Sequence, residues 1–314
     1  MQRMKLGVII VSWNVNRHLK LCLDSLQRVF QTPATRQVLS GDPIVIVVDN
    51  ASEDGSVEMV KVSHPWVKLF ASQENMGYVK GNNYCIQHLL HLSNDKPDAI
   101  WLLNPDTVVH GNAVTKLIWF LLQNPNAGLI GPALCNTDGS FQDSAFRFPG
   151  LMQPLFDFKL LPERLYFSAL NGRYHRHLYE NKKPFKVGHP LGAAMLARTE
   201  TIEKIGLLDD QFFMYCEEID WAWRMKQSGW ERWIVPEALV THHGGASTRQ
   251  SKPKTTTYLW ESRARLYHKY SNDLVYMVVS YLVRRHFSNQ TPASEDWRMA
   301  YRNIIAAWKS PRKK

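Results

Sequence analysis

The sequence predicts an α/β fold, a largely parallel sheet with helices on both faces. Short apolar runs alternate with segments of helical spacing in the first third of the chain, and each run ends in carboxylate- or amide-bearing residues. Such alternation needs crossover connections, which bring the polar ends of the strands to one edge of the sheet. The 314 residues, 45% hydrophobic and 21% charged, are enough for one large globular domain with an appendage.

The first element is an apolar run over residues 6–11, which ends in Ser12-Trp13-Asn14. No small-residue cleavage site follows it, so we interpret the run as a strand and not as a signal peptide. Next, Leu19, Leu23 and Leu26 recur on one face of a helix over residues 16–30. After a link that contains Pro and Gly, strands are expected at 44–48, 67–71 and 99–103, and helices after residue 56 and near 78–92.

The expected strand at 99–103 ends abruptly in a turn that carries Asp106 at its tip. Ligands of open α/β sheets collect outside the carboxyl ends of such strands, where a carboxylate can hold a hard metal ion or face a diphosphate. The alternative is an Asn-Pro-Asp turn that only ends a strand. The sequence contains neither GxGxxG nor GxxxxGK[ST], so a Rossmann dinucleotide site and a P-loop are not supported.

The second half predicts a fifth strand at 129–134 and a hairpin turn at Asp138-Gly139-Ser140. Residues 149–186 show no clear period and predict a long loop with short helices. Two closing strands are expected at 233–236 and 238–243. The four cysteines form no CxxC pair, which argues against a disulfide framework or a zinc site and fits a reducing cytoplasm.

Charge divides the chain into a neutral part and a basic tail. Residues 249–314 carry 14 Lys or Arg and 4 Asp or Glu, so the net charge of +10 lies there and the other residues balance to zero. We therefore predict a domain over 1–250 and a basic helical extension over 251–314. This extension could contact anionic lipid or nucleic acid, or be a solvated surface. No stretch approaches the ~20 apolar residues of a membrane span.

Seven motifs follow one another in a specific order: VIIVSWN, VVDNASEDGS, ENMGYVKGNN, LNPDT, GAAMLAR, DDQFFMYCEEIDWAWR and VTHHGGAST. This order resembles the inverting family 2 glycosyltransferases, and within them the rhamnosyltransferase-like members that use dTDP- or UDP-sugars. The resemblance covers roughly residues 5 to 250. It implies a GT-A fold, a nucleotide-sugar donor and a divalent cation, Mg²⁺ or Mn²⁺.

The resemblance also implies which residues bind the donor. Ser12 and Asn14 are expected beside the nucleotide, and Asp49 on its base or ribose. Asn75, Gly77 and Asn82 match the N-x-G-x-x-x-x-N signature at a helix start, where free N–H groups favour anions. Asn83 is an alternative in that helix. Further expected donor-binding residues are Asn104 and Arg249, the latter in a segment that could close over the diphosphate.

Asn104 and Asp106 correspond to the DxD metal motif of the family, with Asn in the first place. Asp106 is therefore expected to be the principal metal ligand. His242 matches the late metal-ligand histidine of the family, and His243 is an alternative. The cation would stabilise the charge that develops on the departing nucleoside diphosphate.

Inversion requires a base that deprotonates the acceptor hydroxyl during its attack. Glu218, within Glu217-Glu218-Ile219-Asp220, stands where the family has its catalytic Asp. Glu217 and Asp220 remain alternatives, because they share a helical face. Crowding of these carboxylates is expected to raise the pKa of at least one.

The resemblance therefore implies a metal-dependent inverting glycosyltransferase. We expect it to transfer rhamnose or a similar sugar to a carbohydrate acceptor, lipid-linked, and the resemblance implies a role in cell-surface polysaccharide synthesis. The expected location is the cytoplasm, with peripheral attachment to the inner face of the membrane through the basic tail. The alternatives are a non-catalytic nucleotide-sugar-binding subunit and a nucleic-acid-binding protein, the latter disfavoured because the charge is confined to the tail. The oligomeric state is left open.

Overall fold

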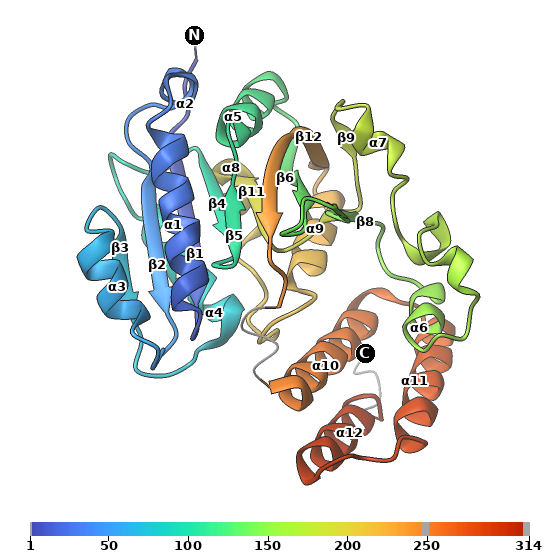
Figure 1. Ribbon diagram of the computed structural model, residues 1–314. Helices are drawn as coiled ribbons and strands as arrows, with labels where there is room; N and C mark the ends of the chain where they lie inside the picture. Colours follow the sequence, from blue (N-terminus) through green and yellow to red (C-terminus); the bar gives the residue numbers. More distant parts are fainter. Residues whose placement is uncertain (1, 246–250, 310–314) are drawn as a thin grey trace.

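The computed structural model describes residues 2–245 and 251–309. In these ranges a ten-stranded mixed sheet has the strand order β3-β2-β1-β4-β11-β6-β12-β5, with β7 paired to β6 and β9 to β12. Helices cover both faces of the sheet (Figure 1). The strands of this sheet are β1 (Leu6–Ser12), β2 (Ile44–Asp49), β3 (Lys68–Ala71), β4 (Ala99–Leu103), β5 (Thr107–Val109), β6 (Ala127–Cys135), β7 (Phe141–Gln142), β9 (Phe185–Lys186), β11 (Ala194–Arg198) and β12 (Glu231–His242).

The predicted parallel part of the sheet is confirmed. Strands β3, β2, β1 and β4 run parallel, and Ser12 at the end of β1 lies opposite Asp49 at the end of β2. Strand β11 is antiparallel to both of its neighbours, β4 and β6, which makes the sheet mixed. The carboxyl ends of β1, β2 and β4 therefore meet at one edge, as their polar endings predicted.

Side-chain alternation along the strands divides the core into two layers. On β1, Val8 and Ile10 face the layer formed with α1, α2, α3 and α5, while Ile9 and Val11 face α4, α8 and α9. The predicted apolar face of the first helix is fully buried in the first layer. The helices are α1 (Asn16–Phe30), α2 (Pro33–Val38), α3 (Ser56–Ser63), α4 (Gly77–Leu90), α5 (Ala113–Gln123), α8 (Thr199–Ile205) and α9 (Glu217–Gln227).

Two elements differ from the prediction. The two closing strands are one strand, β12, whose register shifts between Val235 and Leu239. Pro236 lies within that shift and has no N–H to donate to the ladder, so the pairing is interrupted without ending the strand. The link after the first helix contains α2, because Thr32 caps it by accepting from the N–H of Thr35 and Pro33 occupies its first turn.

The segment 149–186 is the expected long loop with short helices, α6 (Met152–Asp157), η1 (Glu163–Leu165), η2 (Ala169–Asn171) and α7 (His177–Glu180). The hairpin predicted before it joins β6 and β7. Nearby, β8 (Ala145–Phe146) and β10 (His189–Pro190) form a separate two-stranded sheet. The short strands β7, β9 and β10 thus lie beside β6 and β12.

The C-terminal helices are α10 (Lys252–Tyr270), α11 (Asp273–Ser288) and α12 (Glu295–Ala307), and they share a core that includes Trp260, Val283 and Trp308. They form a bundle at one end of the molecule, with α6 beside α11 (Figure 1). Leu266 of α10 also belongs to the main core. Within the ranges that the structure describes, every helix falls short of the length and apolarity needed to cross a bilayer.

Candidate functional site

A cavity of about 570 Å³ lies at the carboxyl ends of β1 and β4. It collects residues from the sheet edge, from the starts of α4, α9 and α10, and from the end of β12. Eight of its lining residues are among those that the sequence predicted: Ser12, Asn75, Gly77, Asn104, Asp106, Glu217, Glu218 and His242. The lining also includes Trp13, Tyr78, Phe213, Lys254 and Tyr258, to which the sequence assigned no role.

Asp106 and His242 meet on one wall of this cavity. Oδ1 of Asp106 lies 3.4 Å from Nε2 of His242, although the two residues come from distant parts of the chain. Antiparallel pairing of β5 with β12, in which His242 lies opposite Thr107, brings them together. The N–H of His243 also donates to the carbonyl of Asp106 at 2.9 Å, which fixes the turn.

Gln142 determines which nitrogen of His242 faces Asp106 as an acceptor. Nε2 of Gln142 donates to Oδ1 of Asn136 at 2.9 Å, so its Oε1 is left to accept from Nδ1 of His242 at 3.0 Å. In the neutral imidazole the lone pair then lies on Nε2, directed at a carboxylate oxygen. A histidine nitrogen and a carboxylate oxygen placed in this way fit a divalent metal ion.

The remaining metal ligands would have to come from the donor and from water. The described residues contain no cluster of three or more His, Cys, Asp or Glu able to hold a metal. Mg²⁺ and similar ions commonly use one or two protein groups plus substrate phosphates. His243 instead contacts the ring of His18 edge to face, 4.9 Å between centroids, and is not among the cavity-lining residues.

Glu217 and Glu218 lie at the start of α9, on the wall shared with Gly192. The two preceding residues, Tyr215 and Cys216, have φ angles of 68° and 66°. A left-handed conformation costs non-glycine residues on the order of 1–3 kcal/mol and concentrates at functional sites. This turn aims both carboxylates into the cavity. Within the described part of the chain, Oε2 of each has no hydrogen-bond partner.

Burial raises the pKa of Glu218 to about 7, against the smaller lowering effect of backbone N–H groups at the helix start and of Arg263. Burial and the neighbouring Glu218 raise the pKa of Glu217 well above its usual value. The pKa values of both carboxyls are therefore raised, and ionisation of either carboxyl raises the pKa of the other. A carboxylate whose pKa lies near the working pH suits general base catalysis.

Asp220 does not face the cavity. It is fully buried and accepts from Nε of Arg224 at 2.9 Å, from the hydroxyl of Tyr270 at 2.7 Å, and from Nζ of Lys269. These partners tie α10 to α9. Its oxygens are occupied by three donors and it is not among the cavity-lining residues, which supports a structural role for Asp220 rather than that of the base.

Buried polar atoms without a hydrogen-bond partner in the described part of the chain lie at the ends of β1 and β2. Among the described residues, Oγ of Ser12 and Oδ2 of Asp49 are buried without a hydrogen-bond partner, and so is Oδ1 of Asn50. Oδ1 of Asp49 accepts from the N–H of Ser52 at 2.8 Å. Buried polar atoms are normally paired, so this group fits the hydroxyl and amide groups of a nucleoside.

Asn14 and Asn82 each make a hydrogen bond within the protein, and Oδ1 of Asn82 is buried without a partner among the described residues. Oδ1 of Asn14 accepts from the N–H of Glu53 at 2.8 Å, and Nδ2 of Asn82 donates to the carbonyl of Tyr78 at 2.9 Å. Neither residue is among those lining the cavity. Asn83, the alternative, exchanges two hydrogen bonds with the backbone of Leu208.

The first N–H groups of α4 have hydrogen-bond partners within the protein. The N–H of Gly77 donates to Oδ1 of Asn75 at 2.9 Å, and the N–H groups of Tyr78 and Val79 donate to the carbonyl of Phe213 at 3.0 and 3.4 Å. These three N–H groups are thus not free in the structure, while Asn75 and Gly77 both line the cavity. Gly77 has φ 83°, and a Cβ on it would lie 2.7 Å from the ring of Phe213. Its role is to let the segment before α9 pack closely.

A cation reaches the cavity from α10. Lys254 lines it from the first turn of that helix, next to Ser251 and Tyr258. The sequence did not predict Lys254, because it is one of several basic residues in the C-terminal tail. Helical periodicity alone does not show which turn of a helix meets the sheet edge. Arg249, predicted for the diphosphate, lies outside the described residues.

The sequence model of the family described as "Glycosyltransferase like family 2" matches residues 3–268. The chain belongs to this glycosyltransferase family. Over 250 residues it is 28% identical to the N-acetylglucosaminyl-diphospho-decaprenol L-rhamnosyltransferase of Mycobacterium tuberculosis. This alignment covers 77% of each of the two chains. It is 24% identical over 203 residues to the dTDP-rhamnosyl transferase RfbF of Shigella flexneri, covering 63% of this chain and 59% of the relative. The predicted family and its rhamnosyltransferase-like subgroup are confirmed.

Solved structures support the GT-A fold of this glycosyltransferase. A structure of GalNAc-T7 with UDP, GalNAc and Mn²⁺ aligns with 98% of the chain at a TM-score of 0.60 and 15% identity, covering 56% of that protein's chain. Residues 1–349 of Staphylococcus aureus TarS align with 98% of the chain at a TM-score of 0.53 and 14% identity, covering 81% of that chain. At these identities the comparison speaks for the fold alone.

Proposed function

We propose that this glycosyltransferase moves rhamnose or a similar sugar from a dTDP- or UDP-sugar, with Mg²⁺ or Mn²⁺, onto a lipid-linked carbohydrate acceptor at a membrane surface. The observation that carries the proposal is the presence of Asp106 and His242 on one wall of the cavity and of Glu217 and Glu218 on another. The Mycobacterium tuberculosis relative is named for a decaprenol-linked acceptor, and the Shigella relative for a dTDP-rhamnosyl donor.

In the proposed mechanism the donor's nucleoside lies against the unpaired atoms of Ser12 and Asp49. Asp106 and His242 would hold a metal ion, which would supply positive charge for the leaving diphosphate. Lys254 adds a cation on the α10 side of the cavity, where a diphosphate bound near the metal ligands can be reached. The donor is thereby fixed with its sugar toward the start of α9.

Glu218 is the proposed base. It accepts the proton of the acceptor hydroxyl while that oxygen bonds to the anomeric carbon and the carbon–diphosphate bond breaks on the opposite face, so the configuration inverts. Glu217, whose pKa is raised by burial and by Glu218, donates a hydrogen bond to an acceptor or sugar oxygen when it is protonated. Peripheral attachment through the basic C-terminal helices would place the cavity near a lipid-linked acceptor.

The first experiment is a thermal-shift screen of the purified chain with nucleotide sugars and free nucleotides, each with Mg²⁺, with Mn²⁺ and with EDTA. A ligand at a hundredfold excess over Kd adds about 2.7 kcal/mol of stability. The proposal expects a metal-dependent shift with dTDP-rhamnose or a UDP-sugar, and transfer of that sugar in a product assay. Binding without transfer or donor hydrolysis would instead favour a non-catalytic nucleotide-sugar-binding subunit.

A further inference from the structure

Helix α11 exposes apolar side chains where a surface helix normally carries polar ones. Leu274, Met277, Val278 and Tyr281 are 67%, 59%, 37% and 53% exposed. Their i, i+3, i+4, i+7 spacing places them on one face of the helix, which we call the α11 stripe. Scattered apolar residues at a surface need no explanation, but a contiguous row of four does.

The α11 stripe is not part of the bundle core. The core side of α11 consists of Tyr276, Val279, Val283 and Phe287, which pack with residues of α10 and α12. Both faces of α11 are therefore apolar. One apolar face of this helix is buried in the bundle core, and the second, the α11 stripe, is left without a partner surface within the described part of the chain.

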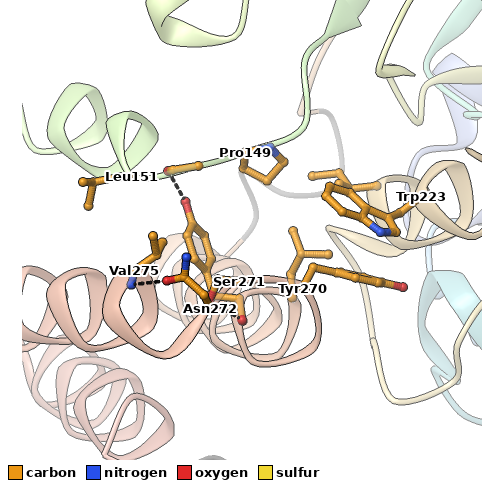
Figure 2. A pocket seen from close by; sticks show the side chains of 11 residues that line it. Pro149, Leu151, Trp223, Tyr270, Ser271, Asn272 and Val275 are labelled. Carbon is orange, nitrogen blue, oxygen red and sulfur yellow. Dashed lines mark hydrogen bonds between the residues drawn. The ribbon is translucent and has the colours of Figure 1, made fainter. Parts of the chain in front are cut away.

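A second cavity, of about 220 Å³, adjoins the start of α11 (Figure 2). Its apolar wall includes Leu151, Trp223, Leu266 and Val275. Several polar groups of its wall bond within the protein. The Tyr267 hydroxyl donates to the carbonyl of Gly150 at 2.7 Å, the Tyr270 hydroxyl donates to Asp220, and Oδ1 of Asn272 accepts from the N–H of Val275. The cavity therefore suits a hydrocarbon better than a sugar.

This cavity lies between the α11 stripe and the proposed catalytic helix. Val275, next to Leu274 of the stripe, lines it on one side, and Ile219 and Trp223 of α9 line it on the other. Ile219 directly follows Glu218 in the chain. An acceptor whose hydrocarbon part occupies the cavity would thus have its polar end close to the start of α9.

Charge favours a lipid surface as the partner of the stripe. Residues 252–309 carry ten Lys or Arg and four Asp or Glu. Arg285 follows Tyr281 by one helical turn on the same face and donates to its hydroxyl at 3.0 Å. Asp273, at the other end of the stripe, is the acidic exception on this helix. Apolar residues with flanking cations are typical of helices that lie in an anionic bilayer interface.

A second copy of the chain fits the stripe less well. Four side chains cover roughly a few hundred Å², whereas each partner of a stable protein interface commonly buries about 800 Å². Insertion of a few apolar side chains into a bilayer has no such minimum area. We infer that the α11 stripe docks on an anionic bilayer and that the adjoining cavity takes the hydrocarbon segment of a lipid-linked acceptor. This inference rests on the proposed function.

Docking is tested by co-sedimentation of the full chain with vesicles of phosphatidylcholine and phosphatidylglycerol. Replacement of both Leu274 and Met277 by Gln is expected to lower the vesicle partition coefficient at least tenfold, because the two side chains no longer enter the hydrocarbon. Val62→Gln is the matched control: Val62 lies on α3 and is 81% exposed, so its variant should sediment as the wild type does.

Equal sedimentation of the double variant and the wild type would overturn the docking proposal. So would a dimeric wild type, seen by light scattering, that the double variant converts to a monomer, because the stripe would then bind a second copy. Transfer to a short water-soluble acceptor separates these outcomes from the proposed function. If the wild type transfers no sugar to soluble or lipid-linked acceptors, it is the proposed function that fails.

The cavity is tested by Leu151→Trp, at a position that is 39% exposed and can accept a larger side chain. The KM for a prenyl-diphosphate-linked acceptor should rise about tenfold while that for the soluble acceptor stays unchanged. Leu151→Gln, which adds little volume but makes the wall polar, should act in the same direction. Equal KM changes for both acceptors, or no change in either variant, would refute the assignment of the cavity.

Discussion

Nε2 of His242 lies 3.4 Å from Oδ1 of Asp106, across a sheet pairing that joins β5 to β12. The contact connects the turn after β4 to a strand more than a hundred residues later. A histidine nitrogen and a carboxylate oxygen are both common ligands of divalent metal ions. The proposed metal site thus rests on this pair, and the first two predictions concern it.

His242→Ala is expected to lower the affinity for Mn²⁺, in the presence of a nucleoside diphosphate, at least tenfold. Loss of one of two protein ligands leaves the ion bound by Asp106 and the phosphates alone. Isothermal titration or the electron paramagnetic resonance of free Mn²⁺ measures the change. His243→Ala is the control, since His243 packs on His18. A larger loss in the control than in His242→Ala would reverse the assignment.

Gln142→Leu is expected to weaken Mn²⁺ binding by roughly 10-fold to 100-fold, the range found for residues that orient metal ligands. Without the acceptor on Gln142, the Nδ1 proton of His242 is no longer fixed and the imidazole can turn or change tautomer. The same titration tests this effect. Gln87→Leu, at an exposed position on α4, supplies the control and should bind Mn²⁺ as the wild type does.

Sugar transfer should depend on the ionisation of Glu218, whose pKa burial raises to about 7. We expect kcat/KM to rise with pH and to level off above about 7, and Glu218→Gln to lower kcat by about 10²–10⁴-fold. Glu217→Gln, which keeps a hydrogen-bond donor, should retain far more activity. A pH profile that is unchanged in Glu218→Gln would assign the base elsewhere.

The same raised pKa predicts the sign of a stability effect. The folded chain binds the Glu218 proton more tightly than the unfolded chain, so this contribution is fully present below the unfolded pKa and is lost as pH rises through about 7. Glu218→Gln should therefore unfold at a higher temperature than the wild type at pH 8, with a smaller difference at pH 5.

Asp220→Ala is expected to lower the free energy of unfolding by about 3 kcal/mol, because it leaves Arg224 and Lys269 without their buried carboxylate. Urea denaturation measures the loss. Glu237→Ala breaks a more exposed pair with Lys116 and should cost less than about 1 kcal/mol. Equal costs in the two variants would contradict the structural role of Asp220.

Gly77→Ala should weaken donor binding and destabilise the fold, because its Cβ would lie 2.7 Å from the Phe213 ring and displace the segment that leads into α9. Gly139→Ala is the matched control, with φ 79° but no atom within 4 Å of the added Cβ. It should lose only about 1–2 kcal/mol from the left-handed backbone and leave the donor Kd unchanged. A donor Kd that is unaffected in Gly77→Ala would contradict this role.

Much of the sheet could be predicted because apolar runs and helical spacing are local signals. The strand ends at Ser12, Asp49 and Leu103 follow from where each run stops, and α1 from the spacing of its leucines. The continuity of β12 could not be predicted, since Pro236 ends a run locally while pairing with β6 on both sides continues the strand. The long-range pairing of β12 with β6 therefore outweighs the local effect of Pro236.

The sequence by itself determined the family and the residue types of the site, since motif order and strand-end chemistry are properties of the chain. Only the tertiary structure decided between neighbouring candidates. It directs the side chain of His242 and not that of His243 at Asp106, and it occupies Asp220 with three donors from α9 and α10, while Glu217 and Glu218 both line the cavity. The physical reason is that adjacent residues share nearly the same sequence environment, whereas strand pairing and helix packing decide where each side chain lies.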